Sequence, residues 1–339
     1  MLIPRLEIAR ILFAGLLALI ATRTECAPPA GYYDSAQGKT GAALRRALHA
    51  IITNAVVIPY SSTARADAVD ALMDIDQDWS NTNNVILIYS GWSTAKTNFN
   101  ATNQFGWERE HLWPNSYGID SRGPAYSDLH NLRPIDSNVN SSRGNKFYDY
   151  SDPADVNFRF PAFPEAPLCS SDTDSWEPPD TMKGDIARAV FYMDIRYEGD
   201  RVSEDNLTLT SDTATIASST NRMGRLSTLL QWHQLDPVDE RESKRNDLVF
   251  SNWQHNRNPF VDRPEWVDLV YRPRIATVHG SNFVQLSWGT EFSNAVVETT
   301  MQLNAGWLPL ATASTNTGDN LVAYPAITNA VQYYRLRVP

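Results

Sequence analysis

Cysteine is nearly absent from this 339-residue chain, which contains only Cys26 and Cys169. If an N-terminal signal peptide is cut at or just after Cys26, the mature chain keeps Cys169 alone and forms no internal disulfide. A small disulfide-stabilised fold is therefore excluded, and stability must come from apolar packing. We expect Cys169 to be a buried core residue rather than a nucleophile.

Long hydrophobic runs are absent beyond the N-terminus. There, Arg5 and Arg10 precede an apolar run over residues 11–21, and small residues follow near Ala27. This pattern is typical of a secretory signal peptide, here residues 1–27, and the run is shorter than the roughly 20 residues that span a bilayer. We expect a secreted or periplasmic mature protein with no stable membrane insertion.

Positive charge is in deficit, because 29 Lys and Arg face 39 Asp and Glu and give a net charge of −10. This balance argues against a protein that holds polyanions by bulk charge alone. It does not exclude an enzyme that acts on nucleic acid, since a local basic patch or a bound cation can supply attraction over a small footprint.

The distribution of apolar residues predicts an α+β fold in two parts. A mainly helical domain is expected at residues 28–274, and a small all-β, sandwich-like module at residues 275–339, where short apolar runs alternate with turn residues. The module is a candidate for binding a surface or a glycan. In the main domain we expect a strand at 83–91 and helices at 41–53, 66–79, 185–199, 225–237 and 240–256.

Two segments concentrate the side chains that could perform chemistry. They are "WEREHLWPN", residues 107–115, and "SDLHNLRPIDSNVNSSRGNKFYD", residues 127–149. Alternation in the first segment suits a strand, "DLHNLRPI" suits a second strand, and "DSNVNSSRGN" begins like a helix. In this strand, strand, helix unit Glu110 and His111 leave the first strand, and Asn140 faces them from the helix.

These residue types suit phosphodiester hydrolysis. Mg²⁺ prefers oxygen ligands, which the Glu110 carboxylate and the Asn140 amide offer. His111, with an ordinary pKa near about 6.5, can take a proton from water at neutral pH. A zinc hydrolase is disfavoured, because no HExxH pair exists and His233 and His255 lie on separate segments.

The chain from residue 31 to 263 resembles the endonuclease I family of secreted bacterial nucleases, which are ββα-metal, or His-Me finger, nucleases. Five blocks carry the resemblance in one order: "GYYDSAQGKTGAALRRALHAII", "WEREHLWPN", "SDLHNLRPIDSNVNSSRGN", "KGDIARAVFYMDIRY" and "LQWHQLDPVDERESKRNDLVFSNWQHNRNPFVD". The resemblance implies that His111 is the general base and that Glu110 and Asn140 bind the metal. It also implies a phosphate-binding arginine between the two strands, for which Arg122 is the best match.

Four further residues have a supporting role in this interpretation. Arg143 and Asn145, in the tail of the motif, would brace the helix or approach the substrate. His130 is expected to orient the strand pair through hydrogen bonds rather than to contact substrate. For Arg257, an internal ion pair and a supporting role at the cleft both remain open.

The sequence therefore predicts a secreted, monomeric, sequence-nonspecific endonuclease. It would use one Mg²⁺, or Mn²⁺, to hydrolyse DNA and RNA and leave 5′-phosphate ends, as the resemblance implies. One alternative is a secreted nucleic-acid-binding or adhesion protein with a silent nuclease centre. Another is a narrow phosphodiesterase acting on a small nucleotide.

Overall fold

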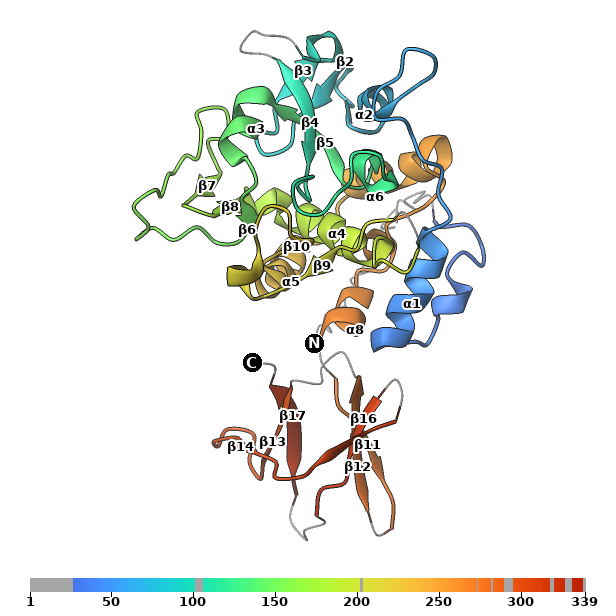
Figure 1. Cartoon of the computed structure of the whole chain (residues 1–339), viewed down its shortest axis with the longest axis vertical. Coiled ribbons are helices and arrows are strands. Elements are labelled where there is room, and N and C mark those ends of the chain that lie inside the picture. Colours follow the sequence, from blue (N-terminus) through green and yellow to red (C-terminus); the bar gives the residue numbers. More distant parts are fainter. Residues whose placement is uncertain are drawn as a thin grey trace, which may run out of the picture.

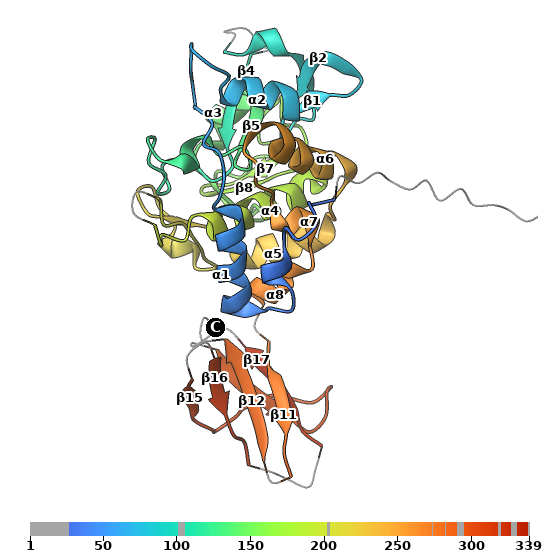
Figure 2. The same ribbon diagram turned by 90° about the vertical axis from the view of Figure 1, so that its right-hand side faces the viewer.

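The computed structural model describes residues 27–100, 106–201, 204–272, 274–281, 283–289, 295–317, 320–326 and 331–337. Helices and small sheets form a main body, and a module built of strands lies at one end of it (Figure 1, Figure 2). The fold is α+β, as expected. Residues 1–26 of the proposed signal peptide lie outside the described residues, among which no helix is long and apolar enough to cross a membrane.

The helices of the main body match most of the sequence expectations. They are α1 Gly41–Ile52, α2 Ala68–Ile75, α3 Ser137–Arg143, α4 Asp180–Arg196, α5 Leu226–Leu235, α6 Glu240–Leu248, α7 Pro259–Asp262 and α8 Trp266–Tyr271. The helix expected at 240–256 stops being α-helical at Leu248 and continues as a π-helical turn, Val249–Trp253.

The longest helix, α4, passes through the centre of the main body, and most of its residues are buried. Helix α5 packs along it, and Gly184 allows the close approach, because a Cβ at this position would clash with the main-chain carbonyl of Asp236. Around α4 lies a large apolar cluster that includes Phe191, Trp232 and Tyr271. This core gives the small sheets a rigid support.

Among the described residues of the main body, short strands form four small sheets. They are β1 Gln77–Asp78 with β2 Asn81–Ile86 and β3 Ser93–Ala95; β4 Trp107–His111 with β5 Leu132–Asp136; β6 Phe147–Tyr148 with β7 Ser170–Ser171 and β8 Ser175–Glu177; and β9 Thr208–Leu209 with β10 Arg222–Met223. The strand expected at 83–91 was too long, because the chain leaves β2 at Ile86 and turns through Tyr89 and Gly91, both with positive φ. The turn carries Tyr89 into the core.

The expected strand, strand, helix unit is present as β4, β5 and α3. The two strands are antiparallel, with Glu110 opposite Arg133 and His111 opposite Leu132. Helix α3 starts directly after β5, because the Asp136 side chain accepts hydrogen bonds from the first free amides, those of Asn138 and Val139.

The second strand of this unit is shorter than expected. Residues 128–131 form a turn instead of extending β5, and the strand begins at Leu132. The turn is held by the Asp128 carboxylate, which accepts from the His130 amide, and by the Asp128 carbonyl, which accepts from Asn131. Asp128 thus satisfies the main chain locally, and these residues leave the strand ladder.

The described part of the C-terminal module forms two small sheets. Strands β11 Ala276–His279, β12 Val284–Gly289, β16 Asn320–Ala323 and β15 Ser314–Asn316 form one, and β14 Leu308–Pro309, β13 Val296–Thr300 and β17 Tyr333–Arg337 form the other. Their apolar cluster contains buried Leu286 and Trp288 and shares no described residue with the clusters of the main body. A pocket of about 580 Å³ lies between the module, the start of α1 and the end of α8, and residues of all three line it.

This separation predicts that a chain ending at residue 274 folds without the module. Because the cut divides no buried apolar cluster of the described residues, we expect the free energy of unfolding to fall by less than about 1 kcal/mol. This limit corresponds to a decrease of at most about 2–4 °C in the unfolding midpoint. Thermal unfolding of the full and shortened mature chains measures the difference. Aggregation or loss of cooperative unfolding in the shortened chain would contradict the prediction.

Candidate active site

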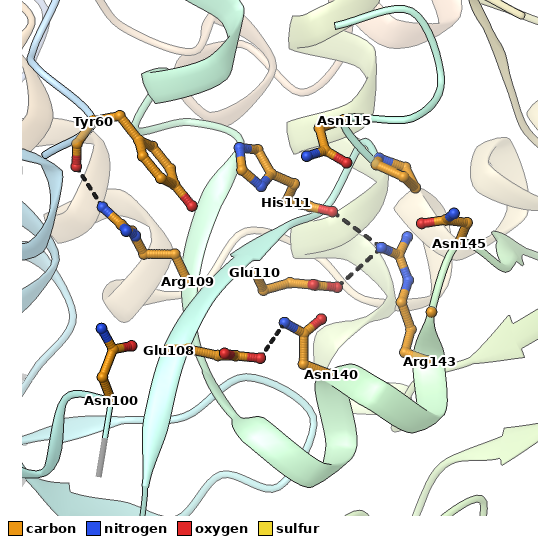
Figure 3. Close-up of a pocket in the computed structure, with 12 residues that line it drawn as sticks. Tyr60, Asn100, Glu108, Arg109, Glu110, His111, Asn115, Asn140, Arg143 and Asn145 are labelled. Atoms are coloured by element: carbon orange, nitrogen blue, oxygen red, sulfur yellow. Dashed lines mark hydrogen bonds and ion pairs between the residues drawn. The ribbon is translucent and has the colours of Figure 1, made fainter. Parts of the chain in front are cut away.

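Strand β4 and helix α3 of this unit line a polar pocket of about 280 Å³. Figure 3 shows Glu108 and Glu110 leaving β4 on the same side, toward Asn140 and Arg143. Side chains at positions i and i+2 of a strand share a face, which explains this pairing. The pocket is lined by Tyr60, Asn100, Glu108, Arg109, Glu110, His111, Pro114, Asn115, Asn140, Arg143, Gly144 and Asn145.

Glu110 is a buried carboxylate held by two neighbours. The Tyr89 hydroxyl donates to its Oε1 at 2.9 Å, and Arg143 Nη1 lies 3.1 Å from the same oxygen. Tyr148 continues this series of hydrogen bonds, because its hydroxyl lies 2.7 Å from that of Tyr89. Burial raises the pKa of Glu110 and the Arg143 charge opposes the rise, so this carboxylate takes up a proton more readily than an exposed one.

His111 is held in one tautomer by the main chain. Its Nε2 lies 2.8 Å from the carbonyl oxygen of Tyr126, which can only accept, so Nε2 carries the hydrogen and Nδ1 keeps its lone pair. Burial is the main cause that lowers the pKa of His111 to about 4; the hydrogen bond to the Tyr126 carbonyl opposes this shift, and the charges of Arg109 and Arg143 add to it. The ring is therefore a neutral base at neutral pH.

Asn140 is oriented by Glu108, a residue to which the sequence assigned no role. The Asn140 Nδ2 donates to Glu108 Oε1 at 2.6 Å. With its nitrogen engaged there, the amide leaves Oδ1 as the group that can bind a cation in the pocket. The alternation of Glu108 and Glu110 on one strand face was the signal in the sequence that could have indicated this pair.

Arg143 connects the helix to the end of β4. Its guanidinium donates to the main-chain carbonyls of His111, at 3.0 Å, and Leu112, at 2.9 Å, while it pairs with Glu110. The Tyr148 ring lies 4.9 Å from the guanidinium carbon. Asn145 follows the end of α3 and also lines the pocket.

Arg109 and Tyr60 form the opposite wall, and the sequence did not indicate either of them. The Arg109 guanidinium carbon lies 3.5 Å from the Tyr60 ring centroid, and the guanidinium also donates to the Tyr60 carbonyl and to Ser61 Oγ. The Tyr60 ring stacks on His111, with centroids 5.7 Å apart. Arg109 thus adds a second positive charge to a pocket that also contains Arg143 and two carboxylates.

Arg122 is not brought to this pocket. Its side chain is 88% exposed and pairs with Asp120 at 2.8 Å on the surface. The arginines that do line the pocket are Arg109 and Arg143, so the geometry lends no support to Arg122 as the phosphate-binding residue.

His130 and Arg257 lie in the core, away from the pocket lining. His130 Nε2 is 3.4 Å from the Asn256 carbonyl, and its ring packs on Tyr192 with centroids 4.4 Å apart. Arg257 pairs with Asp247 and Asp262, each at 2.7 Å. Both residues have structural contacts in this fold, and the internal ion pair is the interpretation of Arg257 that the geometry favours.

Comparison with known proteins identifies the class as an enzyme that hydrolyses nucleic acids. The family model described as Endonuclease I matches residues 40–265, so the chain belongs to the endonuclease I family. Its relatives include proteins named "Extracellular ribonuclease" from Bacillus subtilis (strain 168), 43% identical over 76% of this chain and 84% of the relative, and from Bacillus amyloliquefaciens, 43% identical over 74% and 81%. A protein named "Endonuclease-1" from Buchnera aphidicola subsp. Baizongia pistaciae (strain Bp) is 29% identical over 40% of this chain and 46% of that relative.

The buried histidines predict a loss of stability in mild acid. Burial lowers the pKa of both His111 and His130 to about 4, so between about pH 6.5 and 4 the unfolded chain binds protons that the folded chain does not. The contribution of these two histidines to the free energy of unfolding is therefore fully present above about pH 6.5. It falls as the pH decreases toward about 4, by up to about 1.4 kcal/mol per pH unit for each histidine.

Urea unfolding at several pH values measures this slope. The variant His130→Gln should have a shallower dependence than the parent chain, whatever its stability at pH 7. An equal slope in both proteins would show that His130 titrates normally in the folded state.

Proposed function

We propose that the chain is a secreted, divalent-metal-dependent endonuclease that hydrolyses phosphodiester bonds of DNA and RNA. One observation carries the proposal: His111, fixed as an Nε2–H tautomer by the Tyr126 carbonyl, shares a pocket with Glu110 and Asn140. On this proposal β4, β5 and α3 form a His-Me finger. The names of the Bacillus relatives support secretion and RNA as a substrate.

The donor set of the pocket fits a hard divalent cation. The Glu110 carboxylate and the Asn140 amide oxygen would hold Mg²⁺, or Mn²⁺, which share this preference for oxygen. The ion would supply positive charge to the phosphate oxygens as the transition state forms. Glu108 binds the Asn140 Nδ2, so that Oδ1 is the amide atom available to the ion, and Arg143 holds the Glu110 carboxylate through an ion pair.

His111 supplies the base. Its free Nδ1 takes a proton from a water molecule, whose oxygen forms a bond to phosphorus while the bond from phosphorus to the 3′ oxygen breaks. The departing oxygen takes a proton from solvent, and the phosphate stays on the 5′ side. Because the Tyr126 carbonyl accepts from Nε2–H, it stabilises the imidazolium that forms during this step.

Lack of sequence preference follows from the groups that the pocket offers. Its polar side chains suit a phosphodiester, and backbone phosphates carry no direct sequence code. Charge is supplied locally by Arg109 and Arg143 in a chain with a net charge of −10. A protein with this balance would bind its substrate over a short footprint rather than by bulk attraction.

Replacement of the base tests the enzyme proposal. His111→Ala should lower kcat by about 10²–10⁴ on both plasmid DNA and RNA in Mg²⁺, because general base catalysis is worth that much. His279→Ala, at an exposed position on β11, is the matched control and should keep full activity. Gel analysis of nicked and linear plasmid provides the rate.

Two results would contradict the proposal. If plasmid and RNA stay intact after incubation of the parent chain with Mg²⁺, the chain is not a nuclease of this kind. Equal rates for the parent and His111→Ala would show that His111 is not the general base. Binding without cleavage, with and without chelator, would instead support a nucleic-acid-binding or adhesion protein with a silent centre.

Glu108 gives a separate prediction about metal binding. Glu108→Ala frees the Asn140 amide to rotate, so the Mg²⁺ concentration for half-maximal activity should rise by about 10–100-fold, as for other residues that orient metal ligands. Glu108→Gln keeps an acceptor oxygen and should lie closer to the parent. Calorimetric titration with Mn²⁺ measures the affinity directly, and identical affinities in all three proteins would show that Glu108 does not orient Asn140.

A further inference from the structure

A second cluster of metal-binding side chains lies outside the pocket, where the end of α1 meets the chain that follows α4. His49 belongs to the last turn of α1, and Glu198 and Asp200 come directly after α4. One ligand atom from each residue lies within 4.8 Å of the other two. None of the three lines the active-site pocket, so this cluster is independent of the proposed function.

The contact of His49 Nδ1 with the main chain determines which ring nitrogen is available to bind a metal. His49 is 5% exposed, and its Nδ1 lies 2.8 Å from the carbonyl oxygen of Ile195. A carbonyl can only accept, so Nδ1 carries a hydrogen. A backbone carbonyl that accepts from one ring nitrogen is the usual partner of a histidine that binds metal through the other.

The second ring nitrogen, Nε2, faces oxygen atoms that have no hydrogen to give it. It lies 2.9 Å from Asp200 Oδ1 and 3.3 Å from Thr53 Oγ1. The Thr53 hydroxyl donates its hydrogen to the His49 carbonyl, and an ionised Asp200 has none. In the neutral ring Nε2 then keeps its lone pair, and this lone pair and the Asp200 oxygen are both available to a cation.

The charge of the cluster favours a cation. Arg45 pairs with Asp194 at 2.6 Å and with Glu198 Oε2 at 3.1 Å, so Asp194 offsets the arginine and the cluster keeps the charge of two carboxylates. The 2.9 Å between Nε2 and Asp200 Oδ1 is the distance of an ordinary hydrogen bond, and it also brings the two atoms close enough to bind one ion.

We propose that His49 Nε2 and the Asp200 carboxylate bind a divalent transition metal such as Zn²⁺, with the Glu198 carboxylate, whose Oε1 lies 3.9 Å from His49 Nδ1, as the third ligand. One imidazole nitrogen with two carboxylates suits Zn²⁺ better than Mg²⁺, which prefers oxygen alone. Three protein ligands leave a position for water. The ion would fasten the chain after α4 to the end of α1 and would stabilise the folded protein by binding it in preference to the unfolded chain.

The test uses the full mature chain with the first metal position removed. In Glu110→Ala/Asn140→Ala protein, Zn²⁺ titrated in a calorimeter should bind with one equivalent and raise the unfolding temperature. Adding His49→Gln should weaken binding by more than about tenfold. Because His49 is buried, Asp200→Asn, at a half-exposed side chain, provides a second variant that is safe for folding and should weaken binding in the same way.

Asp212→Asn, on an exposed side chain elsewhere, is the matched control and should leave binding unchanged. Absence of saturable Zn²⁺ binding in the Glu110→Ala/Asn140→Ala protein would overturn the proposal, as would undiminished affinity in both His49→Gln and Asp200→Asn. The contact between His49 and Asp200 would then be a direct one with no ion between them. Neither result would bear on the nuclease activity, which is measured with plasmid and RNA.

Discussion

The Arg143 guanidinium is the contact on which the geometry of the pocket depends. It binds the Glu110 side chain and the carbonyls of His111 and Leu112 at once, so it fixes helix α3 against the end of β4. Asn140 lies on the same helix, one turn earlier, so this arginine and the hydrogen bond from Asn140 to Glu108 together hold Asn140 near Glu110. Arg143 stays buried and charged because Glu110 and the carbonyls replace its water.

Burial gives the two neighbouring side chains of β4 different properties. The same loss of water raises the pKa of the Glu110 carboxylate and lowers that of the His111 ring, since each effect disfavours the charged form. For His111 the outcome is a ready base, and for Glu110 it is a carboxylate that needs a positive partner. Arg143 is that partner in the structure, and a bound cation would serve the same purpose in the proposed enzyme.

The sequence predicted those parts of the site that depend on local patterns, and missed those made by distant or main-chain groups. Period-two alternation located β4, and the Asp136 cap located α3, so Glu110, His111 and Asn140 were expected to meet. The Tyr126 carbonyl has no side-chain signature, and Tyr89 reaches Glu110 only because a turn replaces the end of an expected strand. Arg122 matches the phosphate-binding arginine of the family only by its position between the two strands in the sequence, and this position gives no information on its distance from the pocket.

The hydrogen bond from Asn140 to Glu108 has a consequence for the choice of expression host. Asn140, Ser141 and Ser142 form an N-glycosylation sequon. The sugar would be attached to Nδ2, the same nitrogen that donates to Glu108. A eukaryotic secretory pathway that glycosylated the chain before it folded would place a glycan inside the pocket and separate α3 from β4. Protein from such a host would be inactive for a reason unrelated to its amino-acid sequence, whereas a bacterial cytoplasm or periplasm without this modification would leave the amide intact.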